Sequence, residues 1–222
     1  MPEFKFDAYA PAEMAERVER VGVTKGNLDF WSLFILGTLA GVFIAFGANL
    51  FNLVVHDSSL SFGLTQLIGG IAFSLGLVLV IVAGAELFTG NNLIIMAYME
   101  RKITLKQLLR NWTIVFIGNF FGSLLMVFAV YLSGQWVLNS CLVGGKALLI
   151  ANTKVNLPLM QAFTRGILCN TLVCLAVWLS FACREVVSKI LAITFPITAF
   201  VAAGFEHSIA NMYFIPLGLM LK

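Results

Sequence analysis

Residues 83–91 read AGAELFTGN, and residues 203–211 read AGFEHSIAN. When the two stretches are aligned, they share an alanine, a glycine, a glutamate and an asparagine at a constant offset of about 120 residues. The identical pairs are Ala83/Ala203, Gly84/Gly204, Glu86/Glu206 and Asn91/Asn211. Each stretch lies inside a long apolar run and carries groups that such a run normally excludes, namely a carboxylate, glycine and an amide.

This pair of stretches predicts how the chain meets a bilayer. Because lipid offers no partner to free backbone groups, a helix can break inside a membrane only where protein or a polar cavity satisfies them. Two matching interrupted helices are typical of an inverted-repeat transporter or channel whose site lies where the helices break. The sequence therefore predicts an all-α membrane protein with an inverted repeat and two broken transmembrane helices.

The composition also indicates a membrane protein. Of the 222 residues, 60% are hydrophobic and 11% are charged, and the mean hydropathy is +0.95. A soluble domain of this size needs far more polar surface. The net charge of +3 is modest and the basic residues cluster at helix ends, so the lipid bilayer is an expected partner and nucleic acid is not.

Hydrophobicity divides the chain into an N-terminal segment and two repeats. In order they are a cytoplasmic amphipathic segment (1–27), a first repeat (28–138), an outer loop (139–157) and a second repeat (158–222). The predicted spans are 28–55, 62–84, 112–136 and 158–183, with shorter pieces at 91–99, 190–204 and 209–221 around the two breaks. Nothing in the second repeat pairs with 112–136, so a sixth helix is expected to be absent from this chain. The amphipathic segment is typical of an anchor on the membrane face, with gating as the alternative.

The basic residues give an expected orientation. Lys25, the cluster from Arg101 to Arg110, and the Arg184 to Lys189 pair flank alternate ends of the spans, while the first loop between spans has no Lys or Arg. The positive-inside rule then places the N-terminus in the cytoplasm, and a multi-pass protein of the inner (plasma) membrane is expected. Lys146 and Lys154 lie outside against this trend, which favours attraction of anions at the outer mouth.

His207 is the clearest candidate for function. It lies in the second break, about mid-bilayer by the lengths of the apolar runs on either side, where ionisable residues are costly and usually functional. A neutral imidazole in such a dry place could donate a hydrogen bond or a proton to a passing anion. A structural histidine that bonds loop carbonyls is the alternative.

The other polar residues of the breaks fit the same site. Glu86 and Glu206 are interpreted as carboxylates that accept backbone N–H bonds and hold the turns, with proton transfer as the alternative. Asn91 and Asn211 begin half-helices whose positive N-terminal ends favour an anion at the midplane. Thr89 either adds a hydroxyl there or satisfies a local loop bond.

Residues typical of catalysis or of metal binding do not occur in the required patterns. The two histidines, His56 and His207, have no Ser/His/Asp or His-x-x-x-His spacing, and a nucleotide-binding loop is absent. The four cysteines show no paired spacing for a metal site, and three of them fall in apolar segments. We therefore expect no enzyme activity, no metal and no cofactor.

Four stretches together carry a specific resemblance. They are AELFTGN (85–91), RNW with GNFFG (110–122), GILCN with LVCLAVW (166–178) and GFEHSIANM (204–212). Over nearly its whole length the chain resembles the formate/nitrite transporter family. The resemblance implies an aquaporin-like fold, a homopentamer with one pore per protomer, and passage of small monovalent anions such as formate, nitrite or hydrosulfide.

The resemblance also implies roles for single residues. His207 matches the central pore histidine and Thr89 its partner, while Lys154 and Asn170 match a lysine and an asparagine that tune the field at the histidine. By its residue type alone, Asn170 could equally bond a neighbouring helix. The implied apolar constrictions are Phe73 and Phe200 on the outer side, and Leu77, Leu87 and Phe88 on the inner side. Taken without the resemblance, these five residues fit ordinary packing.

The resulting hypothesis is a channel for weak-acid anions, most of all formate, in which His207 neutralises or hydrogen-bonds the anion between the two constrictions. The stretch FDAYAPAEM (6–14) and the surroundings of Lys154 favour formate, with nitrite or hydrosulfide as alternative main substrates. An alternative of another class is an aquaporin-type pore for neutral solutes, although the Asn-Pro-Ala repeats of such pores are absent here. A membrane-embedded enzyme using His207 and Glu206 lacks a nucleophile and a metal.

Overall fold

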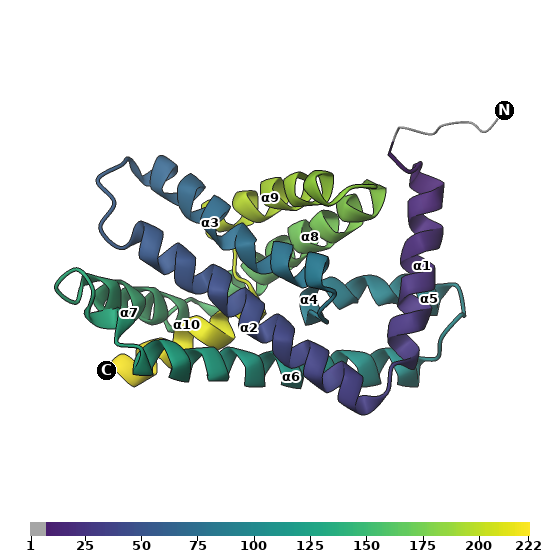
Figure 1. Cartoon of the computed structure of the whole chain (residues 1–222), viewed down its shortest axis with the longest axis horizontal. Helices are drawn as coiled ribbons and strands as arrows, with labels where there is room; N and C mark the ends of the chain where they lie inside the picture. Colours follow the sequence, from purple (N-terminus) through teal and green to yellow (C-terminus); the bar gives the residue numbers. More distant parts are fainter. Residues whose placement is uncertain (1–7) are drawn as a thin grey trace.

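The computed structural model describes residues 8–222, and every regular element within that range is a helix (Figure 1). Four helices are long and apolar enough to cross a membrane, namely α2 (Phe30–Val55), α3 (Phe62–Ala83), α6 (Leu105–Leu132) and α8 (Leu159–Ala182). Two shorter apolar helices follow, α9 (Val186–Ala202) and α10 (Ser208–Leu221). The prediction of an all-α membrane protein is confirmed.

Both predicted breaks are present. The first interrupts the chain between α3 and a shorter continuation made of α4 (Phe88–Asn91), the 3₁₀ helix η1 (Asn92–Ile94) and α5 (Ile95–Met99), and the second separates α9 from α10. In Figure 1 the ends of these interrupted helices meet near the middle of the bundle, far from both of its ends. The matching stretches of sequence therefore mark the centre of the fold.

The two ends of the bundle differ, and we name them by the helices found there. Helix α1 (Pro11–Asn27) runs across one end, which we call the α1 end (Figure 1). At the opposite end, which we call the α7 end, helix α7 (Leu142–Val155) lies beside α10. A short 3₁₀ helix, η2 (Gln135–Val137), leads from α6 towards α7.

Helix α1 agrees only in part with the predicted N-terminal segment. The amphipathic helix forms, but Met14 and Val18 are buried against the protein, where α1 contacts α5, η1 and α8. The apolar face of this segment is therefore covered by the bundle and not by lipid. Residues 1–7 of the predicted segment lie outside the described residues.

Two further boundaries differ from the sequence-based expectation. Residues 139–157, expected as a polar outer loop, contain α7, because Val143, Ala147 and Ala151 recur at helical spacing and are buried. Helix α6 begins at Leu105, ahead of the predicted 112, because a capping box starts it there. In that box, the Thr104 Oγ1 accepts the Gln107 N–H at 3.2 Å, and the Gln107 Oε1 accepts the Thr104 N–H at 2.8 Å.

Small residues allow the central helices to pack closely, as GxxxG-type patterns indicate. A Cβ atom added to Gly41 of α2 would fall on the Asn119 carbonyl oxygen, and one added to Gly122 of α6 would fall on the Thr38 carbonyl oxygen. The α2–α6 interface thus leaves no room for a methyl group on either side. This close approach places Asn119, in the middle of α6, directly against the first break.

Helix α8 is the least covered of the four long helices. In its most apolar window 22% of the residues are buried, whereas the corresponding figure is 44% for α2 and for α6. Within residues 8–222 no helix packs along α8 as α6 packs along α2. Much of the surface of α8 is therefore exposed in the part of the chain that the structure describes.

Candidate functional site

The two helix breaks share one backbone geometry. The helices before them end at Gly84 (φ 78°) and Gly204 (φ 69°), both in the left-handed region that closes a helix and favours glycine. The next helices start after Leu87 (φ −104°, ψ 123°) and His207 (φ −99°, ψ 115°), which occupy the same extended N-cap conformation. Leu87 and His207 are thus equivalent positions of the repeat, and only one of them carries a polar side chain.

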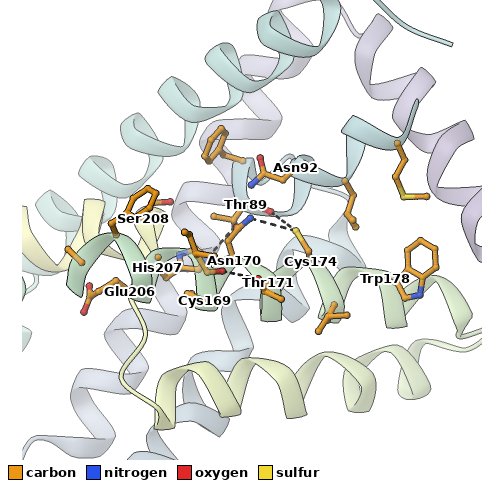
Figure 2. Close-up of a pocket in the computed structure, with 18 residues that line it drawn as sticks. Thr89, Asn92, Cys169, Asn170, Thr171, Cys174, Trp178, Glu206, His207 and Ser208 are labelled. Atoms are coloured by element: carbon orange, nitrogen blue, oxygen red, sulfur yellow. Dashed lines mark hydrogen bonds between the residues drawn. The ribbon is translucent and has the colours of Figure 1, made fainter. Parts of the chain in front are cut away.

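His207 caps its own helix, and this fixes the state of its ring. The Ala210 N–H donates to Nδ1 of His207 at 3.1 Å, so Nδ1 is an acceptor and the ring proton resides on Nε2. That Nε2 lies 3.2 Å from Oγ1 of Thr89, as Figure 2 shows across the break. An imidazolium would carry a second proton on Nδ1 and lose the cap. The geometry therefore holds His207 as a neutral N–H donor that is 4% exposed.

Beside His207, a lysine and an asparagine bind the glutamate of the second break. Oε2 of Glu206 accepts from Nζ of Lys154 at 2.7 Å and from Nδ2 of Asn211 at 2.8 Å. Lys154 belongs to α7, and 15% of its side chain is exposed. Its ammonium is thus placed close to the break and partly desolvated.

An equivalent group forms at the first break. Oε1 of Glu86 lies 2.9 Å from Nζ of Lys25, and its Oε2 accepts from Nδ2 of Asn91 at 2.7 Å. Oδ1 of Asn91 accepts from the same Lys25 ammonium at 2.8 Å. We call Lys25–Glu86–Asn91 and Lys154–Glu206–Asn211 the two lysine triads. Each lysine comes from the helix that precedes its repeat, α1 in the first case and α7 in the second.

The role of the glutamates differs from the expected one. The side chains of Glu86 and Glu206 bind lysine and asparagine side chains, whereas the sequence suggested backbone N–H groups. At the first break, the side chain of Asn119 fills that task, because its Oδ1 accepts the Phe88 N–H at 2.9 Å. Its Nδ2 also donates to the carbonyl oxygens of Gly37 at 2.7 Å and Glu86 at 2.9 Å. Asn119 thus bonds the broken segment to two neighbouring helices.

Sequence reasoning missed Lys25 as a site residue and treated Asn119 only as a place of close helix contact. Asn111 was also missed; its Oδ1 accepts from Nδ2 of Asn91 at 3.0 Å, and its Nδ2 donates to the Lys25 carbonyl oxygen at 3.0 Å. A signal for Lys25 did exist. It lies just ahead of the first repeat, as Lys154 lies just ahead of the second, so extending the repeat alignment to the preceding helices would have found it.

The aromatic side chains assigned to the outer constriction lie against the histidine. The ring centroids of Phe73 and Phe200 are 5.7 Å apart, and both rings are almost fully buried. Phe200 stacks on the His207 ring at 5.7 Å with an interplanar angle of 17°, and Phe73 meets it edge-on at 6.2 Å. These two rings thus bound the imidazole on the side of the α7 end.

The residues assigned to the inner constriction separate into two places. Leu77 and Leu87 are buried and line a cavity at the α1 end. Phe88 instead packs edge-on against Phe116 and Trp112 of α6, at 5.0 and 6.5 Å between centroids. Phe88 therefore packs against α6 and lines the large cavity beside α8, whereas the two leucines line the cavity of the α1 end.

Three cavities surround the two breaks. One of about 230 Å³ at the α1 end is lined by Lys25, Leu77 and Leu87, and one of about 360 Å³ at the α7 end is lined by Lys154 and His207. A third, of about 1080 Å³, follows the exposed flank of α8 and also reaches His207 (Figure 2). His207 thus stands between the cavity of the α7 end and the large lateral cavity.

Asn170 points into the large cavity, near Thr89 and His207 (Figure 2). Its Nδ2 donates to Sγ of Cys174 at 3.7 Å, and Cys174 in turn donates to the Thr89 carbonyl oxygen at 3.6 Å. Oδ1 of Asn170 is buried without a hydrogen-bond partner. Because buried polar atoms are normally satisfied, this orphan amide oxygen favours a polar guest over simple helix contact.

Within residues 8–222 no three His, Cys, Asp or Glu side chains gather as a metal site would require. His56 lies apart from the breaks, in the loop after α2, where Nδ1 bonds the Leu53 carbonyl oxygen at 2.7 Å and Nε2 lies 2.9 Å from Nδ2 of Asn139. The polar centre of the protein therefore consists of His207, Thr89, Asn170 and the two lysine triads.

Comparison with known proteins places this geometry in context. The sequence model of a family described as formate/nitrite transporter matches residues 12–222. The chain is 41% identical over 218 residues to the formate channel FocA of Escherichia coli (strain K12), which covers 98% of this chain and 76% of that protein. It is 44% identical over 216 residues to the uncharacterized transporter YrhG of Bacillus subtilis (strain 168), covering 93% of this chain and 78% of that protein.

Solved structures show the same fold. A structure described as a pentameric formate channel with formate bound superposes with a TM-score of 0.82 at 39% identity, covering 86% of this chain and 75% of that one. A structure described as an FNT family ion channel superposes with a TM-score of 0.84 at 26% identity, covering 93% and 82% of the two chains.

Proposed function

The chain belongs to the formate/nitrite transporter family, and on that premise we propose that it is a channel for small monovalent weak-acid anions, with formate as the main substrate. The observation that carries this proposal is the state of His207, which is held as a neutral Nε2–H donor between the α7-end cavity that contains Lys154 and the large lateral cavity. A buried donor at this position suits a guest that offers oxygen acceptors.

The two lysine triads attract the anion from the α1 end and from the α7 end of the bundle. In each triad the ammonium is balanced by a glutamate, so the pair attracts an anion without holding it as an isolated charge would. A conducting site must bind well enough to admit the ion and weakly enough to release it. The compensated lysines Lys25 and Lys154 meet both requirements.

The apolar residues next to each lysine remove water from the guest. Phe73 and Phe200 do so on the side of Lys154, and Leu77 and Leu87 on the side of Lys25. An unpaired anion in such surroundings is very unfavourable. The channel therefore needs a partner for the anion at the point where the water is lost.

His207 and Thr89 supply that partner. The Nε2–H of His207 turns from Thr89 to an oxygen of the guest, and the Thr89 hydroxyl, no longer an acceptor, donates to the other oxygen. Because Nδ1 already accepts the Ala210 N–H, a neutral ring that gave up its Nε2 proton would become an imidazolate. The geometry thus favours His207 as a hydrogen-bond donor, and a proton that accompanies the anion comes from the aqueous side.

Several further assignments follow the family and the relatives named above. The relative with bound formate is pentameric, and we propose a homopentamer here with one pore in each protomer. We also propose a multi-pass protein of the inner membrane with the α1 end in the cytoplasm, since Lys25, Arg101, Arg110 and Arg184 gather there. Nitrite and hydrosulfide have the same charge and are small enough to compete.

Formate flux into liposomes tests the proposal. We expect wild-type protein to give formate flux that rises as the pH falls, and His207→Phe to lose most of it. His56→Phe is the matched control, since it removes the other histidine, which lies outside the breaks. The proposed role of His207 in the pore is wrong if His207→Phe retains the formate flux of the wild type at every pH. Osmotic swelling without any anion flux would instead identify a pore for neutral solutes.

A further inference from the structure

A fourth cavity lies at the α1 end, outside the site described so far. It has a volume of about 290 Å³ and is lined by the middle of α1, the end of α8 and the start of α9. Its charged lining is entirely basic among the residues that the structure describes. These cationic residues are Arg17, Arg20, Arg184 and Lys189.

Among the described residues, none of the four cations has a carboxylate partner. Lys25 pairs with Glu86 and Lys102 pairs with Glu19, so carboxylates are available to α1 and are used elsewhere. In the described part of the chain, none of the four cavity residues forms an ion pair, and no Asp or Glu lines the cavity. Like charges held together without a counter-charge repel one another, which indicates that an anion completes the group.

Tyr9 holds two of the guanidinium groups in position. Cζ of Arg17 lies 3.7 Å and Cζ of Arg184 4.3 Å from the centroid of the Tyr9 ring. The Tyr9 N–H donates to the Ala182 carbonyl oxygen at 3.0 Å, which fixes the tyrosine to the end of α8. Two arginines from distant parts of the chain are thus held against one aromatic ring before any ligand arrives, which lowers the entropy cost of binding.

We propose that this cavity binds a phosphate group. Arginine presents paired N–H donors that match the oxygens of phosphate, and a phosphate group carries up to about two negative charges near neutral pH, enough to offset much of the local positive charge. The shared chemistry is that of a free phosphate compound or of a phospholipid headgroup.

The site connects two parts of the protein that otherwise meet over a small area. Arg17 and Arg20 belong to α1, whereas Arg184 and Lys189 belong to the α8–α9 turn and to α9. Val21 and Lys189 line both this cavity and the 230 Å³ cavity that contains Lys25. A bound phosphate group therefore links α1 to the α8–α9 turn and to α9, next to the cavity through which an anion would pass.

Binding to the purified full chain tests the proposal without any measurement of transport. Pyrophosphate is the probe for a free ligand, followed by calorimetry, and phosphatidylglycerol against phosphatidylcholine is the probe for a headgroup, followed by native mass spectrometry. The test variant is Arg20→Gln/Arg184→Gln, at two exposed positions. The control is Arg101→Gln/Lys106→Gln, which removes the same charge from the same end of the bundle but outside the cavity.

We expect the test variant to weaken binding of at least one probe by about tenfold or more, since two charge-assisted contacts are lost, and the control to change it less than about twofold. Loss of pyrophosphate binding identifies a free phosphate ligand, and loss of phosphatidylglycerol alone identifies a headgroup. Hydrogen exchange of residues 11–27 should slow with ligand in the wild type and the control only. Equal binding by both double variants, or no binding of either probe to the wild type, overturns the proposal.

Should the double variant fail to fold, the single exposed change Arg20→Gln is measured in its place, with Arg101→Gln as its control. Failure of phosphate binding leaves formate flux untouched, and failure of formate flux leaves phosphate binding untouched. The two proposals are therefore tested separately.

Discussion

The lysine triad of the first break predicts a specific coupling between α1 and the centre of the protein. In Lys25→Met the carboxylate of Glu86, which is 4% exposed, keeps Asn91 but loses its counter-charge. Removing one partner of a buried ion pair costs roughly 3–5 kcal/mol, because a charge remains unpaired. Since 25% of the Lys25 side chain is exposed, water can partly solvate the unpaired Glu86 carboxylate. We therefore expect Lys25→Met to destabilise the protein by about 2–3 kcal/mol.

This loss is large enough to measure. For a chain of 150–250 residues, 1 kcal/mol corresponds to about 2–4 °C in Tm, so Lys25→Met should lower Tm by roughly 4–12 °C in thermal unfolding followed by circular dichroism in detergent. The double variant Lys25→Met/Glu86→Gln should recover most of the loss, because the amide is uncharged and still accepts from Asn91. Lys106→Met, on an exposed lysine, should leave Tm within about 1 °C of the wild type.

The reasoning fails under either of two results. If Lys25→Met is as stable as the wild type, Glu86 does not depend on the lysine for its charge balance. If the double variant is as unstable as the sum of its two single changes, the two side chains do not interact energetically. Both results would remove α1 from the network of the first break.

Three further predictions concern the parts that surround the site. Gly41→Ala should destabilise the protein by about 1–3 kcal/mol in thermal unfolding, because the added Cβ meets the Asn119 carbonyl oxygen. The control Gly63→Ala should not destabilise it, because no atom lies within 4 Å of a Cβ added there. Equal effects of the two changes would contradict close packing of α2 and α6. Asn119→Leu should cost about 2–4 kcal/mol, since it leaves one N–H and two carbonyl oxygens near the first break without this partner; a change below about 0.5 kcal/mol would mean that water replaces the amide. The pKa of Asp29 lies below its usual 3.8 because the hydroxyl and the backbone N–H of Ser32 donate to its carboxylate. The ionised carboxylate should therefore stabilise the start of α2 above pH 3.8, and this stabilisation should be lost as the pH falls through the lowered pKa. Hydrogen exchange of the first turn of α2 should show the loss in the wild type and not in Asp29→Asn.

The sequence predicted the breaks because their chemistry is incompatible with an uninterrupted span. A glycine, a carboxylate and an asparagine inside an apolar run point to broken helices wherever lipid is the solvent. The same reasoning identified His207 as a buried residue, although it could not give the ring its protonation state. That state depends on the bond between Nδ1 and the Ala210 N–H, which exists only once the helix starts at Ser208.

What the sequence could not predict comes from contacts between distant segments. Lys25 looks like an ordinary basic residue at the end of an amphipathic helix, and only the packing of α1 against the bundle brings its ammonium to Glu86. Asn119 looks like one more small polar residue in a helix interface. Its three bonds at the first break depend on the close approach of α2 and α6, which periodicity does not specify.

The equivalent backbone of the two breaks also explains why a leucine can stand at one break where the other has a histidine. Leu87 and His207 hold the same backbone conformation, and each is followed by a new helix whose first N–H groups need acceptors. At the first break the Asn119 side chain takes the Phe88 N–H, so Leu87 is left free to be apolar and to narrow the cavity of the α1 end. At the second break the cap comes from His207 itself, which commits Nδ1 and leaves Nε2–H facing Thr89. The difference in capping between two otherwise matching turns thus places the Nε2–H of His207 at the centre of the bundle, beside the aromatic rings of Phe73 and Phe200.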